Sequence, residues 1–157
     1  MGRMRALMTH LIRARVSSKE PWVSIHDMYI TDIVIGDDSV KFCFADGFNL
    51  VDNGQLIRTG PGDIEFLGCG SENFICDVIQ GRGPWYFGKL ISLEKLRALL
   101  SKGKYRLEIN VELYASNQMY WRGYLIPSDQ HKRLFTRRHN QVVTIEAEYF
   151  PMKYSWV

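Results

Sequence analysis

The basic segment HKRLFTRRH, residues 131–139, contains the residue types that most directly suggest chemistry. Guanidinium and ammonium groups bind phosphate oxygens, and an aromatic ring offers a surface on which a base can stack. Aromatic and basic residues also alternate shortly before it, in MYWRGYL, residues 119–125. The candidate residues for binding single-stranded nucleic acid are Tyr120, Arg122, Tyr124, Lys132, Arg133, Phe135, Arg137 and Arg138.

The same basic segment has a structural interpretation as an ordinary edge strand. The stretch VVTIEAEY, residues 142–149, alternates apolar and polar side chains and predicts a strand. With a turn at Asn140-Gln141, the basic segment would pair with it and set Arg133 opposite Glu148. Cations placed there would gain carboxylate neighbours and discourage edge-to-edge aggregation. On this interpretation the segment binds nothing.

Residues suited to catalysis are present but not grouped. No GxSxG, HExxH or GxxxxGK[ST] motif occurs, and the four histidines are scattered along the chain. A pair formed by His26 and Asp27 could orient a thiol such as Cys43, yet nothing in the sequence places them together. The three cysteines lack a CxxC spacing, which favours reduced, buried thiols over a disulfide or zinc site. We therefore expect a cytoplasmic protein that is not an enzyme and uses no cofactor or metal.

Charge is distributed unevenly along the 157 residues, whose formal net charge is +3. The stretch 27–77 holds ten acidic residues against Lys41 and Arg58, whereas 78–157 is basic. Neighbouring acidic and basic strands would neutralise each other, and an exposed dipole would instead steer a charged partner. No apolar run is long enough to span a membrane.

Residues 1–20 differ from the rest of the chain and carry five basic residues with a single acid, Glu20. This basic leader predicts a helix or a loosely attached segment, and an Arg-rich targeting peptide or an upstream start would look the same. We expect residues 21–157 to form a single β-rich domain, because 46% of the residues are hydrophobic and no linker divides this part.

Period-two alternation after Pro21 predicts antiparallel hairpins. In the first, Ala45-Asp46-Gly47 would form a loop with Gly47 in the left-handed conformation and Phe44 opposite Phe48. In the second, spanning 105–125, Leu107 would face Leu125, Val111 would face Trp121, and Gly123 would lie opposite Ile109. A third hairpin would join residues 63–68 to 73–79.

One helix is expected at about residues 92–102, with Ser92 as its N-cap and Gly103 at its end. The fold predicted is a mainly antiparallel barrel-like roll or sandwich of about eight or nine strands with this helix packed on it. Trp85, Tyr86 and Phe87 form an aromatic cluster that could line the mouth of a barrel holding a small apolar ligand. Trp156 would either dock back into the domain or mark a partner surface.

The chain resembles in type, though in no motif, the small β-rich bacterial immunity and anti-defence proteins that occlude a partner. This resemblance implies a non-enzymatic protein-binding module, either a homodimer paired through a strand edge or a complex with another protein. Single-stranded nucleic-acid binding is the alternative function, and a barrel for a small apolar ligand is the third. The candidate binding residues remain those named above, together with Trp156.

Overall fold

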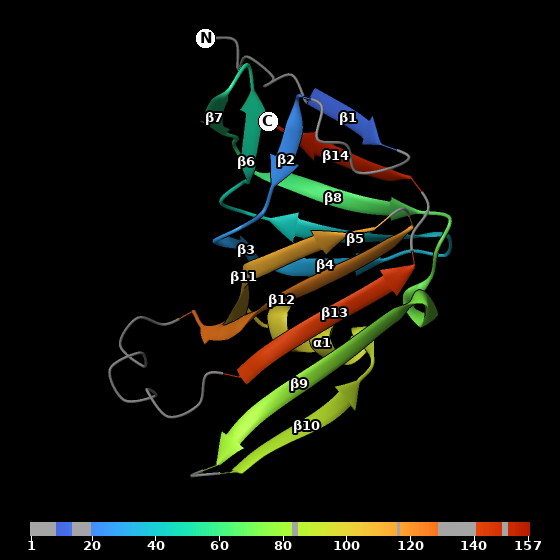
Figure 1. Ribbon diagram of the computed structural model, residues 1–157. Coiled ribbons are helices and arrows are strands. Elements are labelled where there is room, and N and C mark those ends of the chain that lie inside the picture. Colours follow the sequence, from blue (N-terminus) through green and yellow to red (C-terminus); the bar gives the residue numbers. More distant parts are fainter. Residues whose placement is uncertain (1–8, 14–19, 83–84, 116, 129–140, 149–150) are drawn as a thin grey trace, which may run out of the picture.

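The computed structural model describes residues 9–13, 20–82, 85–115, 117–128, 141–148 and 151–157 (Figure 1). These residues form fourteen strands, one α-helix and one short 3-10 helix, so the prediction of a mainly antiparallel β fold is confirmed. Many of the strands span only three to six residues, which is why their number exceeds the expected one. Among the described strands no sheet closes on itself, and the arrangement is a sandwich rather than a barrel.

Three antiparallel sheets make up the fold. The five-stranded sheet has the order β1 (Thr9–Arg13), β14 (Met152–Trp156), β8 (Gly62–Leu67), β5 (Ser39–Phe44) and β4 (Asp32–Ile35). The six-stranded sheet has the order β10 (Trp85–Ile91), β9 (Phe74–Arg82), β13 (Gln141–Glu148), β12 (Gln118–Pro127), β11 (Tyr105–Tyr114) and β3 (Met28–Ile30). The three-stranded sheet has the order β2 (Trp22–Ser24), β6 (Asn49–Asp52) and β7 (Gln55–Arg58).

The core lies between the inner faces of the two larger sheets. Phe42 of β5 packs against Trp121 of β12 at 5.1 Å between ring centroids and against Phe74 of β9 at 5.7 Å. Phe66 of β8 completes the group, 5.5 Å from Trp121. All four rings are buried, so aromatic packing joins the two sheets.

The predicted helix is confirmed as α1 (Leu93–Leu100). The Ser92 hydroxyl accepts a hydrogen bond from the Lys95 N–H, and Gly103 adopts a φ of +65° where its N–H donates to the Leu100 carbonyl. Leu93, Leu96 and Leu100 are buried. The helix contacts β4 of one sheet and β9 and β11 of the other, so it covers one end of the sandwich.

Two of the predicted hairpins are wrong in their pairing. Gly47 does adopt the left-handed conformation, with a φ of +75°, but β5 pairs with β4 and β8 while β6 joins β2 and β7. A Cβ at Gly47 would lie 2.3 Å from the Gly60 carbonyl oxygen. Glycine is therefore needed where the chain turns from β5 toward another sheet. Likewise β8 and β9 belong to different sheets, joined by η1 (Ser71–Asn73). Phe44 and Phe48 still share the core, 5.9 Å apart.

The hairpin of β11 and β12 is partly as predicted. Leu107 faces Leu125 and Ile109 faces Gly123, where an added Cβ would lie 1.9 Å from the Glu108 carbonyl oxygen. A β-bulge then shifts the register by one residue, so that Val111 lies opposite Arg122 rather than Trp121. The predicted face of Val111 is therefore wrong, because the bulge exchanges inward and outward positions beyond it.

Two further expectations need correction. Within the basic leader, Thr9–Arg13 forms β1 and pairs with β14, so these five residues belong to a sheet rather than to a helix or a detached segment. Strand β13 has β12 and β9 as its neighbours, and Glu148 therefore lies opposite Gln118, not Arg133. Both sides of β13 are therefore occupied by other strands, whereas the basic segment itself, residues 131–139, lies outside the described residues.

Candidate functional site

The most unusual surface in the described part of the chain is the edge strand β10. It has a neighbour only on the β9 side, and its residues from Trp85 to Leu90 are all exposed. The exposed fractions reach 68% for Trp85, 78% for Tyr86, 59% for Phe87 and 71% for Leu90. The hairpin of β9 and β10 forms the lower end of the molecule in Figure 1, with β10 outermost. Large apolar side chains gathered on a free strand edge typically mark an interaction surface.

The sequence of β10 explains why the domain leaves it exposed. In the stretch WYFGKLI, Trp85 and Phe87 point to one face, whereas Tyr86 and Leu90 point to the other. A sandwich buries only one face of each sheet, so a strand with large apolar groups on both faces cannot be buried by its own domain. The prediction that this aromatic cluster lines a barrel mouth is wrong, because it lies on an open edge.

The outer face of the six-stranded sheet brings together three of the predicted binding residues, Tyr120, Arg122 and Tyr124. All three extend from β12 on the side opposite the buried Trp121. Their cross-strand neighbours include carboxylates, since Tyr120 pairs with Glu146 and Tyr124 with Glu108. Acidic neighbours repel phosphate, so the carboxylates among the described residues of this face disfavour nucleic-acid binding there.

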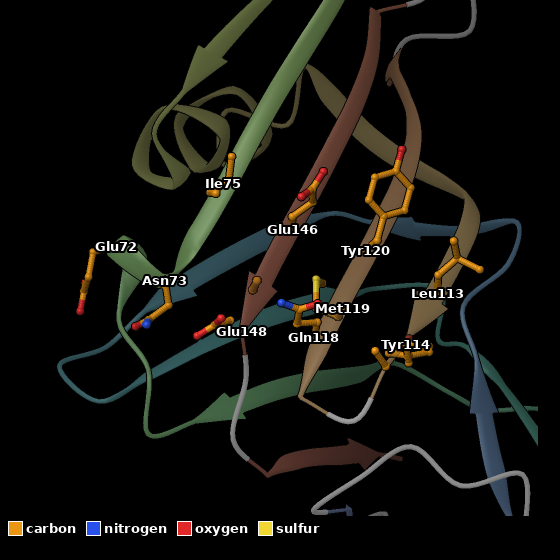
Figure 2. A pocket seen from close by; sticks show the side chains of 12 residues that line it. Glu72, Asn73, Ile75, Leu113, Tyr114, Gln118, Met119, Tyr120, Glu146 and Glu148 are labelled. Atoms are coloured by element: carbon orange, nitrogen blue, oxygen red, sulfur yellow. The ribbon is translucent and has the colours of Figure 1, made fainter.

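A hollow of about 560 Å³ opens on this outer face (Figure 2). Figure 2 shows Glu146 and Tyr120 extending from neighbouring strands along it, with Glu72 and Asn73 at one side. Its lining includes the carboxylates of Glu72, Glu146 and Glu148 and the exposed apolar side chains of Ile75 and Leu113. Its chemistry favours a cationic group with an apolar stem over an anionic ligand.

The remaining predicted site residues are separated from this face or lie outside the described residues. Lys132, Arg133, Phe135, Arg137 and Arg138 all lie outside the described residues. Trp156 is half-buried on β14, where its ring packs 5.9 Å from that of Phe48 and its backbone pairs with Gly62. Of the two alternatives stated for Trp156, docking back into the domain is confirmed.

Sequence reasoning missed a polar network that the β-bulge turns inward. Trp121 Nε1–H donates to the Tyr114 hydroxyl at 3.0 Å, which in turn donates to Glu112 Oε2 at 3.1 Å. Glu112 Oε1 accepts from the Ser24 hydroxyl at 2.6 Å and from the Ile25 N–H at 3.1 Å. Burial raises the pKa of Tyr114 well above its usual value. The network ties β11 and β12 to Ser24 at the end of β2 and to Ile25 after it, which is a structural role.

The side chains considered for catalysis do not form a reactive group in the described residues. His26 Nδ1 lies 3.2 Å from Asp27 Oδ2, but both side chains are exposed. Burial, followed by the charge of Asp63, raises the pKa of Cys43 to about 12, and burial raises that of Cys76 to about 12. A nucleophilic cysteine needs a lowered pKa, so these shifts run in the opposite direction. All three cysteines are free thiols.

The described residues offer neither a metal-binding cluster nor a membrane-spanning helix. Among these residues, no group of three or more His, Cys, Asp or Glu side chains is arranged to hold a metal ion. The helix found there is too short and too polar to cross a membrane.

Comparisons with known proteins add little to this description. No protein-family model matches the chain, and no curated protein matches it either. A solved structure that is similar over its length is the C-terminal domain of HtaA from Corynebacterium glutamicum. The identity is 9%, the alignment covers 94% of this chain and 86% of that one, and the TM-score is 0.24. A likeness at this TM-score supports no conclusion about fold or role.

Proposed function

We propose that this chain is a non-enzymatic protein-binding module and that β10 is its binding edge. The observation that supports the proposal is the exposure of Trp85, Tyr86, Phe87 and Leu90 on a strand with one open side. Aromatic residues are enriched among the side chains that contribute most to the free energy of protein association. A free edge adds unpaired N–H and C=O groups that can hydrogen-bond to a further strand.

The mode of binding we propose is strand addition. A partner segment in extended conformation would continue the six-stranded sheet beyond β10 and bury the apolar side chains on both of its faces. Exposure of the hairpin at one end of the molecule supports this mode, because a partner can reach β10 without displacing another described strand. Such a module acts by occupying a partner's surface, and we keep the cytoplasm as its expected location because the three thiols are free.

A second edge strand provides the matched control. Strand β7 ends the three-stranded sheet and exposes Leu56 at 67%, close to the value for Leu90. It spans only Gln55–Arg58, carries polar residues at both ends and has no aromatic residue. Replacing either leucine by lysine adds the same charge at a similarly exposed strand position, so only the edge differs.

The experiment is capture of partners from native lysate on immobilised protein, with and without nuclease. We expect wild type and Leu56→Lys to retain the same protein partner after nuclease treatment, and Leu90→Lys to lose it. Equal capture by all three variants would contradict the role of β10. Capture that disappears with nuclease would favour the nucleic-acid alternative through the basic segment, residues 131–139.

A further inference from the structure

We propose that the strand added to β10 is β10 of a second copy of this chain, paired antiparallel about a two-fold axis at Gly88. This inference rests on the proposed function and identifies its partner. The pairing would join two six-stranded sheets into one continuous sheet. The sequence and the surroundings of β10 support it in four respects: side-chain complementarity, charge, the space at Gly88, and area.

The side chains of β10 are complementary to their own two-fold copy. Gly88 is the middle residue of the seven in Trp85–Ile91, so antiparallel pairing about it overlaps the whole strand. Residues directly opposite in such a pair share a face of the sheet. Tyr86 would therefore meet Leu90 of the second copy on one face, while Trp85 would meet Ile91 of the second copy on the other. Trp85, Tyr86 and Leu90 would each gain an apolar neighbour.

Charge favours the alignment centred on Gly88 over the alignment centred on Lys89. Lys89 is the single charged residue of β10. Pairing centred on Gly88 sets Lys89 opposite Phe87 of the second copy, where an ammonium group over a ring face is favourable. Pairing centred on Lys89 would instead bring two ammonium groups face to face, which destabilises a strand pair.

Packing within one copy does not require glycine at position 88. A Cβ added there would lie 3.5 Å from the carboxylate oxygens of Asp77, an ordinary contact, and the residue is not in the left-handed region. Glycine in a strand interior is otherwise less favourable than alanine, because it loses more backbone entropy on folding. In the two-fold pair, two facing glycines would leave space at the axis into which Tyr86 and Leu90 of both copies can pack. This packing would explain a glycine at position 88.

The area available fits a reversible dimer. The four exposed side chains offer on the order of 500 Å² of apolar surface in each copy, given about 150–250 Å² for a large aromatic side chain. Two copies would then bury on the order of 1,000 Å², below the roughly 1,200–2,000 Å² of stable complexes. We therefore expect association that depends on protein concentration rather than a permanent dimer.

Site-directed cross-linking of the full chain tests the alignment. Directly opposite residues in an antiparallel pair have Cα atoms about 4.5–5.5 Å apart, within the range of about 4.4–6.8 Å that a disulfide spans. Gly88→Cys should therefore form a disulfide-linked dimer on mild oxidation, whereas Leu56→Cys on β7 should not. The native thiols give little background, because the pKa values of Cys43 and Cys76 are raised to about 12.

A second pair of variants keeps the test independent of substitution at the glycine. Tyr86→Cys and Leu90→Cys proteins should cross-link to each other when mixed, because position 86 of one copy lies opposite position 90 of the other. Each variant alone should cross-link much less, because neither position lies opposite itself. Cross-linking no greater than that of Leu56→Cys in both designs, together with a monomer by sedimentation at high concentration, would overturn the inference.

The outcome also separates this inference from the proposed function. A protein that stays monomeric, yet captures a different protein in a manner abolished by Leu90→Lys, overturns self-pairing and leaves the binding role of β10 intact. Self-association and capture that are both unaffected by Leu90→Lys overturn both. Concentration-dependent dimerisation that Leu90→Lys abolishes and Leu56→Lys retains supports both.

Discussion

Two groups of aromatic side chains on the same six-stranded sheet have opposite environments. Trp121 and Phe74 extend from β12 and β9 into the core, where they pack against Phe42 and Phe66 of the facing sheet. Trp85 and Phe87 on β10, only one strand beyond β9, are exposed to solvent. The residue types are the same, so the difference comes from position in the sheet.

The comparison shows what each group contributes. Aromatic rings between the sheets lose their contact with water when the chain folds, and this burial stabilises the domain. Rings on the open edge stay largely exposed after folding, so they stabilise the domain little and leave an apolar surface that a partner can contact. The buried group therefore stabilises the fold, and the exposed group is the one we propose for association.

The largest expected effect is in the buried group. Phe42→Ala should lower the free energy of unfolding by about 3–5 kcal/mol, because it removes ring contacts with Trp121, Phe74 and Phe66 and leaves a cavity. Denaturant titration measures it. A loss below about 1 kcal/mol, the size typical of an ordinary substitution, would show that these rings do not hold the sheets together.

The next effect concerns the hydroxyl that joins the core to the polar network. Tyr114→Phe should lower the free energy of unfolding by about 1–3 kcal/mol, because Trp121 Nε1–H and Glu112 Oε2 each lose their bond to this hydroxyl. Tyr124→Phe, on the outer face, is the matched control and should change it by less than about 0.5 kcal/mol. Equal effects for the two variants would contradict the inward position that the bulge gives Tyr114.

The buried thiols predict a loss of stability at alkaline pH. The pKa of Cys76 is raised from 9.0 to about 12 in the folded state by burial, so the unfolded chain releases this proton first. Stability from this group is complete below pH 9 and falls as pH rises from about 9 toward 12. Unfolding measured over this range should show a weaker pH dependence for Cys76→Ala than for wild type, and identical slopes would contradict the burial of the thiol.

The smallest effect on stability is expected at β10. Leu90→Lys should change the free energy of unfolding by less than about 0.5 kcal/mol, since the side chain is exposed. The same variant should abolish association through the edge. A large loss of stability in dilute, monomeric protein would mean that Leu90 packs within its own domain, and the contrast between the two aromatic groups would fail.

Local patterns in the sequence predicted those parts of the fold that local chemistry determines. Ser92 and Gly103 mark the two ends of the helix as expected, since a cap and a left-handed glycine act within one turn. Alternation placed Leu107 opposite Leu125, and both are buried. Gly47 was assigned its positive φ correctly for the same reason.

Strand pairing and the binding surface depended on contacts between distant segments. Nothing local shows that β5 pairs with β8 rather than β6, because an inward Phe42 suits either neighbour. The bulge after Ile109 inserts a residue without a sequence signal and so reverses the face of Val111. The cluster around Trp85 was recognised, but aromatic residues in a β-rich chain usually lie in the core, and only the topology reveals β10 as an edge.

Amide hydrogen exchange in β10 tests the central claim most directly. Alternate N–H groups of an edge strand point away from its neighbour, and pairing with a second copy would protect them. As protein concentration is raised, exchange in residues 85–91 should slow, while exchange in β7, residues 55–58, should stay constant. Exchange in residues 85–91 that is the same in dilute and concentrated protein would contradict self-pairing at this edge.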